Sequence, residues 1–123
     1  MQFHRDTSDS INIIGAFGTE GIRVGDGLVV PPSVIAVSVI IENWAVTCVM
    51  ELSADQMMPI IELEPELIVL GSGSHLTFPS PEIGKMVNQR GIGFEVMDTA
   101  AGCRTYNVLA HEGRKVALAL LPE

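Results

Sequence analysis

Residues 53–121 alternate between helix-start signals and apolar runs, and this alternation constrains the fold more than any other feature of the sequence. Ser80 precedes Pro81, and Asp98 precedes Thr99, so each pair offers a side-chain oxygen that can cap the first turn of a helix. Because each start is flanked by apolar runs typical of buried strands, the order becomes strand, helix, strand, helix, strand, the spacing of parallel α/β units. We expect strands at residues 67–70, 92–97 and 115–121, and helices at residues 80–90 and 98–112.

A further short helix is expected before the first of these strands. Ser53 is followed three residues later by Gln56, which is the pattern of a capping box, and the apolar residues through Ile61 continue the helix. Pro59 lies inside this segment and cannot donate a hydrogen bond to the carbonyl four residues back. We therefore expect this helix to be bent or irregular.

The first half of the chain has a different residue pattern. Glycines interrupt runs of β-branched residues, as expected of short strands joined by tight turns. Gly25-Asp26-Gly27 is a hairpin signal, because glycine and aspartate tolerate the positive φ of a tight turn. This half should be mostly antiparallel, with strands at residues 11–17, 21–24, 27–30, 33–40 and 45–49.

Together these patterns predict a three-layer α/β fold. It has a mixed central sheet flanked by helices, and the glycine-rich hairpins of the N-terminal half form an additional antiparallel β layer. The chain has 123 residues, of which 47% are hydrophobic, enough for one core without disulfides or metal. We expect one domain over residues 1–123, with residues 1–10 as a flexible terminus.

The charge balance excludes several classes of partner. Acidic residues outnumber basic ones 15 to 7, which gives a formal net charge of −8 and disfavours nucleic acid. Basic residues form no run that would bind anionic lipid, and no uncharged stretch is long enough to insert into a membrane. The first ten residues resemble neither a secretory nor a transit segment, so we expect a cytoplasmic protein.

The sequence offers no catalytic set and no metal or cofactor site. Cys48 and Cys103 lack the close spacing of thiolate sites, and we expect both to be reduced, buried, small side chains. Cys103 and His111 lie eight residues apart on one expected helix, which separates them by roughly 12 Å at 1.5 Å per residue. That exceeds hydrogen-bond reach, and the histidines show no metal-ligand spacing. We lean against an enzyme.

One candidate binding site is the loop after the first buried strand, formed by Gly71, Ser72, Gly73 and Ser74. Two glycines allow backbone N–H groups to converge on an anion, and the carboxyl ends of strands are where open α/β sheets usually bind ligands. The loop lacks the Lys-Ser/Thr ending of a P-loop and the third glycine of a dinucleotide fingerprint. A plain tight turn therefore stays open as the alternative.

The expected helix after Asp98 supplies the other candidates, Thr99, Arg104 and Asn107. Gly102 lies inside this helix, where glycine costs roughly 1 kcal/mol relative to alanine, so we expect a close backbone approach there. Arg104 has two interpretations. It either holds an anionic ligand or a partner carboxylate, or it bonds within the chain to a carbonyl edge or to Asp98.

Segments of the second half resemble a known family. LIVLGSG at residues 67–73, Phe78-Pro79 and residues 91–120 are similar to the domain-of-unknown-function family related to mitochondrial complex I (NADH dehydrogenase) assembly factor three and the adipogenesis-associated domain protein. The most specific matches are EVMDT, CRTYN and EGR. The resemblance implies a three-layer α/β fold with an extra β layer and no established catalytic residues.

The resemblance also suggests which positions matter. Gly71 and Gly73 match the strand-end loop of the family, and Gly102 stands where the family is expected to have alanine. In the mitochondrial relative the implied role is assembly of a respiratory complex through protein contacts. The signature helix of the family is matched by Thr99, Arg104, Thr105, Tyr106 and Asn107.

Three hypotheses about function remain open. The first is a non-catalytic interaction or assembly module with an unidentified protein partner, or with a second copy of itself, acting through the signature helix and the strand-end loop. The second is a protein or enzyme that binds a small anion between residues 71–74, Thr99 and Arg104. The third is that these residues only hold the fold, which would require Arg104, Thr105 and Asn107 to be buried and paired internally.

Overall fold

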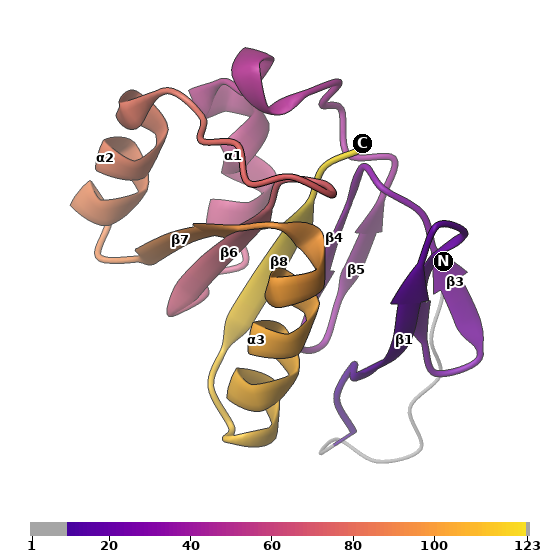
Figure 1. Ribbon diagram of the computed structural model, residues 1–123. Helices are drawn as coiled ribbons and strands as arrows, with labels where there is room; N and C mark the ends of the chain where they lie inside the picture. Colours follow the sequence, from indigo (N-terminus) through magenta and orange to yellow (C-terminus); the bar gives the residue numbers. More distant parts are fainter. Residues whose placement is uncertain (1–9, 123) are drawn as a thin grey trace.

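A five-stranded mixed sheet lies at the centre of the computed structural model, which describes residues 10–122 (Figure 1). The strand order is β5-β4-β8-β6-β7. β6 is parallel to both β7 and β8, whereas β4 runs antiparallel to β5 and β8. The strands are β4 (Ser33–Ala36), β5 (Ile40–Glu42), β6 (Leu67–Gly71), β7 (Gly93–Met97) and β8 (Val116–Leu120).

The helices cover both faces of this sheet. On one face lie α1 (Ala54–Ile61) and α2 (Pro81–Gln89), and on the other lies α3 (Thr99–His111) (Figure 1). Side chains of β8 alternate between the two cores. Ala117 and Ala119 face α1 and α2, whereas Leu118 and Leu120 face α3. Coverage on both sides explains why an apolar run without alternation forms this strand.

The N-terminal half supplies the additional β layer that the glycine pattern predicted. A three-stranded antiparallel sheet, separate from the central one, contains β1 (Ile14–Gly18), β2 (Gly21–Val24) and β3 (Gly27–Val29). Gly25 has a φ of 57° in the turn between β2 and β3, as the hairpin signal requires. The buried face of this sheet packs in the same core as α3. The predicted three-layer α/β fold with a mixed central sheet is therefore confirmed.

The helix boundaries follow the predicted caps closely. The hydroxyl of Ser80 accepts a hydrogen bond from the N–H of Glu82 at 3.3 Å, and the carboxylate of Asp98 accepts one from the N–H of Ala101 at 2.8 Å. Gly91 and Gly113, just past the ends of α2 and α3, have φ values of 79° and 82°.

The capping box before α1 is also formed in part as expected, since the Gln56 side chain accepts from the N–H of Ser53 at 2.9 Å. Pro59 lies inside α1 without ending it, and the helix is continuous from Ala54 to Ile61.

The single strand predicted for residues 33–40 is wrong, because the chain reverses inside this segment. The N–H of Ala36 donates to the carbonyl of Val39 at 2.8 Å, and the two arms pair as the antiparallel strands β4 and β5. The turn contains no glycine, proline or asparagine, and Ser38 is its one turn-favouring residue within a run rich in β-branched side chains, so the signal for a reversal is weak.

The strand predicted for residues 45–49 is also wrong. The indole N–H of Trp44 donates to the carbonyl of Gln56 at 2.8 Å, and the Gln56 side chain donates to the carbonyl of Ala45 at 2.7 Å. These bonds hold the segment against the start of α1, and it leads into a 3-10 turn, η1 (Val49–Glu51). Cys48 is consequently exposed, contrary to the expectation that both cysteines are buried.

The terminus predicted to be flexible, residues 1–10, lies outside the described part of the chain except for Ser10.

Candidate functional site

The strand-end loop and the start of α3 lie side by side, as the sequence predicted. β6 and β7 are neighbours that end at the same edge of the sheet, with Gly71 opposite Met97. The N–H of Gly73 donates to the hydroxyl of Thr99 at 2.9 Å, and the N–H of Thr99 donates to the carbonyl of Gly73 at 2.8 Å. This reciprocal pair joins the loop directly to the first turn of the helix.

Gly71 lies close to both Leu120 and Thr99. A Cβ at this position would lie 3.2 Å from the end of the Leu120 side chain, which is a tight contact, and 3.4 Å from Cα of Thr99, which is ordinary packing distance. The absence of a side chain at residue 71 therefore eases the packing of the loop against the start of α3.

The polar groups of the loop bond mainly within the chain. The N–H of Ser72 donates to the carbonyl of Met97 at 2.8 Å. The Ser72 hydroxyl donates to the carbonyl of His75 at 2.7 Å and accepts from the N–H of Thr77 at 3.1 Å. Ser72 is buried and Ser74 is exposed. The N–H groups of Ser72 and Gly73 thus fasten the loop to β7 and α3, rather than converging on an open anion position.

A hollow of about 410 Å³ adjoins this edge of the sheet. Ser74 and Thr99 contribute to its wall, and the turn between β1 and β2 faces them. Among residues 10–122, Glu20 is its only charged lining residue, and neither Arg104 nor Asn107 lines it. The remaining lining residues are Gly18, Thr19, Gly21, Ile22, Val30, Pro31, Leu121 and Pro122.

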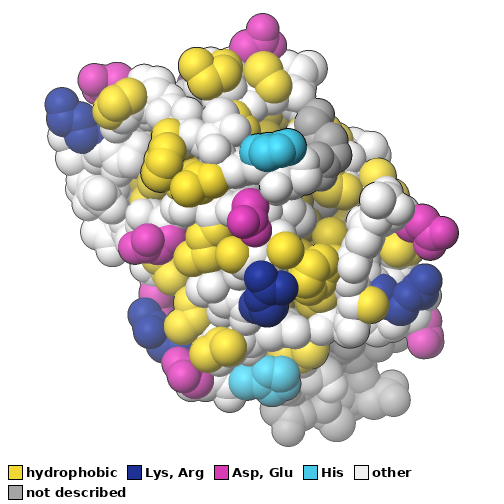
Figure 2. Space-filling view, viewed as in Figure 1, with side chains coloured by type: hydrophobic (Ala, Val, Ile, Leu, Met, Phe, Trp, Pro, Cys, Tyr) yellow, Lys and Arg dark blue, Asp and Glu magenta, His cyan; other side chains and the backbone are white. Residues whose placement is uncertain are grey.

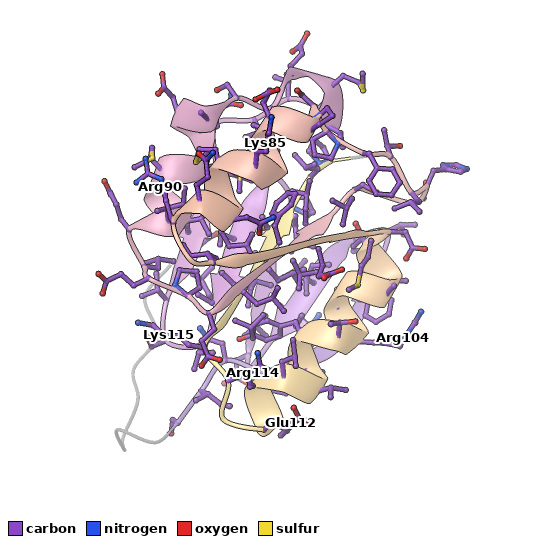
Figure 3. The ribbon with its side chains drawn as sticks, turned by 90° about the vertical axis from the view of Figure 1, so that its left-hand side faces the viewer. Lys85, Arg90, Arg104, Glu112, Arg114 and Lys115 are labelled. Carbon is purple, nitrogen blue, oxygen red and sulfur yellow. The ribbon has the colours of Figure 1, made fainter. Side chains whose placement is uncertain are left out.

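Arg104 points outward from α3 (Figure 3). Its guanidinium carbon lies 5.9 Å from the centre of the Phe17 ring, the geometry of a cation–π contact. Asp98, the intramolecular partner considered from the sequence, caps α3 instead. Among residues 10–122, Arg104 makes no hydrogen bond or ion pair, so its charge is available to another molecule.

Asn107 lies one turn after Arg104 on the same helix and uses both of its side-chain polar groups within the chain. Its side-chain oxygen accepts from the N–H of Ile14 at 2.8 Å, and its side-chain amide donates to the carbonyl of Ile14 at 2.7 Å. The buried hydroxyl of Tyr106, the preceding residue, donates to the carbonyl of Asn12 at 2.7 Å. These bonds attach the chain entering β1 to α3.

Gly102 and Cys103 form the inner surface of α3. A Cβ on Gly102 would lie 3.1 Å from the side chain of Leu118 and 3.7 Å from Cα of Gly71, so the expected close approach is present. Burial raises the pKa of the Cys103 thiol to about 11, although the neighbouring Arg104 charge opposes that rise. The thiol is therefore neutral and packed, which is unlike a nucleophile.

Two apolar side chains beside Arg104 complete a surface that sequence reasoning missed. Phe17 is 39% exposed and supports the guanidinium, while Val108 is 56% exposed and lies one turn after Arg104 on α3. We call Phe17, Arg104 and Val108 the Arg104 surface. Nothing local distinguishes Phe17 from a core residue of β1, but Val108 falls at the i+4 position from a charged residue, which is a usable signal.

The face of the molecule that carries α3 has a mixed character. Apolar side chains gather in its middle, with groups of both charges interspersed among them (Figure 2). Between residues 10 and 122, no group of three or more His, Cys, Asp or Glu side chains is arranged to hold a metal ion. Within the same range, no helix has the length and apolar character needed to span a membrane.

The fold and the site define a small three-layer α/β domain whose signature helix carries buried structural groups and one exposed arginine. The chain belongs to the family described as protein of unknown function (DUF498/DUF598), whose model matches residues 14–121. The family resemblance inferred from the sequence is therefore confirmed.

Named relatives and solved structures agree with this assignment. The chain is 31% identical over 111 residues to NADH dehydrogenase [ubiquinone] 1 alpha subcomplex assembly factor 3 of Mus musculus, covering 89% of this chain and 60% of that protein. It thus spans about 60% of the length of this mammalian relative.

Two solved structures share the fold over most of their length. A Bordetella parapertussis protein is 30% identical, with a TM-score of 0.85 over 95% of this chain and all of that chain (100%). A Xanthomonas campestris protein is 33% identical, with a TM-score of 0.82 over 98% of this chain and 92% of that chain.

Proposed function

We propose that this protein is a non-catalytic interaction module that binds a protein partner through the Arg104 surface. The observation that carries the proposal is the position of Arg104, which lies exposed on the signature helix and is supported by Phe17 rather than by an ion pair with any of residues 10–122. Arginine and aromatic side chains such as Phe17 are enriched in protein interfaces. The planar guanidinium would donate to a carboxylate of the partner.

The relatives support the same class of function. Proteins named as assembly factors act on other proteins, and the match to the mouse assembly factor extends over 89% of this chain. We propose that the partner is a protein of a respiratory complex under assembly, a role that the family assignment alone does not give. The cytoplasmic location expected from the sequence stays a prediction.

Affinity purification with quantitative mass spectrometry tests the proposal directly. Tagged wild-type protein and Arg104→Ala would be expressed in parallel in the native cells, and co-purifying proteins would be measured relative to the bait. We expect at least one protein, or an untagged copy of the chain itself, to be recovered near stoichiometric amounts with the wild type and at least fivefold less with Arg104→Ala.

Arg90→Ala is the matched control, because it removes the same charge from an exposed position at the end of α2, away from α3 (Figure 3). It should recover the partner at the wild-type level. Recovery of no stoichiometric protein with the wild type, or equal losses with both variants, would contradict the proposal.

A small-anion site at the strand ends is the second candidate, favoured by the hollow that Ser74 and Thr99 line together. It has weaker chemical support, because an anion needs compensating positive charge and Glu20 is the one charged residue that the described part of the chain contributes to the wall. Thermal-shift screening against nucleotides and organic acids separates the candidates. Stabilisation that Thr99→Val removes would favour this site, and a flat screen would disfavour it.

A further inference from the structure

A second hollow, of about 570 Å³, opens at the edge of the sheet opposite Ser74 and Thr99. It lies where α3 ends, where β8 begins and where the turn between β4 and β5 passes. Its walls are largely apolar and include Ile11, Val37, Val39, Leu63, Pro65 and Val116. Its volume is within the range of about 300 to 1,000 Å³ that is usual for small-molecule sites.

Among residues 10–122, the charged side chains that line this hollow are basic: Arg114 and Lys115, with His111 beside them. No acidic residue of the described part of the chain lines it, although Glu66 contacts Arg114 from outside the wall. The chain as a whole is acidic, with a formal net charge of −8. Arg114 and Lys115 lie together at one end of the molecule, opposite the end that carries Lys85 and Arg90 (Figure 3).

Contacts within the chain neutralise this charge only in part. Nε of Arg114 donates to the Glu66 carboxylate at 2.9 Å, and the backbone N–H of Lys115 donates to its other oxygen at 3.2 Å. These contacts lower the pKa of Glu66, the Lys115 N–H contributing most. The side chain of Lys115 has no ion pair among residues 10–122, so one positive charge at the mouth remains uncompensated.

Carbonyl groups at the C-terminal end of α3, which is the negative end of its dipole, also have hydrogen-bond partners within the chain. The carbonyls of Leu109 and Ala110 accept hydrogen bonds from the N–H groups of Arg114 and Gly113, both at 3.0 Å. Nδ1 of His111 lies 2.9 Å from the carbonyl of Asn107, which leaves its other ring nitrogen unused by that contact. The mouth therefore presents donors and positive charge above an apolar interior.

We propose that this hollow binds a small organic carboxylate with an aliphatic chain. The apolar walls would bury the chain, and Lys115, with Arg114 beside it, would hold the carboxylate at the mouth. A neutral molecule would leave Lys115 uncompensated, and a cation would be repelled. The site differs from the Arg104 surface in its residues, since neither Phe17, Arg104 nor Val108 lines the hollow.

An amide NMR titration of the full-length protein tests this site with octanoate as the probe. We expect saturable shifts concentrated at Val37, Val39 and Val116. Octanol, with the same chain but no charge, should bind at least about fivefold more weakly, and octylammonium should not saturate the site. Equal binding of octanoate and octanol, or shifts that map elsewhere, would overturn the proposal.

Two exposed substitutions make the test specific. Lys115→Gln should weaken octanoate binding about fivefold and leave octanol binding unchanged. Lys85→Gln makes the same change in net charge on α2 and should leave both affinities at the wild-type value. If Lys115→Gln binds octanoate as tightly as Lys85→Gln does, the mouth does not recognise the carboxylate and the proposal fails.

Discussion

Arg104 and Asn107 lie three residues apart on α3 and have different roles. Both polar groups of the Asn107 side chain form hydrogen bonds with the backbone of Ile14, as the backbone of a neighbouring strand would. The Arg104 guanidinium forms no hydrogen bond or ion pair within residues 10–122 and packs on the ring of Phe17. The hypothesis of a purely structural role required Arg104, Thr105 and Asn107 to be buried and paired internally. Thr105 and Asn107 are paired within the chain but only half-buried, and Arg104 is exposed.

Asn107→Ala should lower the free energy of unfolding by about 1 to 3 kcal/mol. The substitution removes two hydrogen bonds and leaves the N–H and carbonyl of Ile14 without their partner in a half-buried position. Urea denaturation measures the change. Val108→Ala on the same helix, 56% exposed in the wild type, is the control and should change stability by less than about 0.5 kcal/mol. Equal stabilities of the two variants would show that Asn107 does not fasten the N-terminal sheet.

The two thiols should react very differently with a water-soluble disulfide reagent. Cys48 is exposed, whereas Cys103 is buried and has a pKa raised from an ordinary value of 9.0 to about 11. We expect one fast thiol in the folded protein, lost in Cys48→Ser, and two after denaturation. Two equally fast thiols in the native state would contradict this expectation.

The raised pKa of Cys103 also makes stability depend on pH. Since the unfolded chain releases the Cys103 proton at lower pH than the folded one does, the stability that this thiol contributes should be fully present below pH 9.0 and decline as the pH rises towards about 11.

At the scale of elements, the packing of α3 depends on the small size of Gly102. Gly102→Val should destabilise the protein by about 1 to 3 kcal/mol, because its side chain would be forced against Leu118 and the backbone of Gly71. Urea denaturation checks this value. Gly102→Ala should be close to neutral, because a gain in helix propensity of about 1 kcal/mol offsets a single tight contact with the flexible end of Leu118. A Val variant as stable as the Ala variant would mean that α3 does not pack tightly there.

The elements that the sequence predicted well are those whose ends carry local chemistry. Ser80 and Asp98 cap their helices through their own side chains, and Gly91 and Gly113 end them with positive φ. The hairpin of β4 and β5 has no such marker, because its turn forms through the Ala36–Val39 hydrogen bond between ordinary apolar residues. The segment after Trp44 is held by Gln56, a contact that only the tertiary structure supplies.

At the scale of the whole molecule, the order of elements in the sequence predicted which loop and helix meet at the strand ends, but not what surrounds Arg104 and Asn107. Parallel strands must end at one edge, so the meeting of Gly73 and Thr99 could be predicted from order alone. The positions of Arg104 and Asn107 could not, because they depend on where the separate N-terminal sheet packs against α3. The hollow beside Lys115 likewise requires the β4–β5 turn, which the sequence did not reveal.

We propose that the outer side of α3 binds another protein, while side chains on its inner side hold the fold. Photo-crosslinking in living native cells can detect such a partner, with a benzophenone amino acid placed at Val108 in one variant and at Lys85 on α2 in another. We expect a discrete adduct from position 108 that is lost when Arg104→Ala is added, and none from position 85. An adduct from position 85 alone, or one from position 108 that is insensitive to Arg104→Ala, would contradict it.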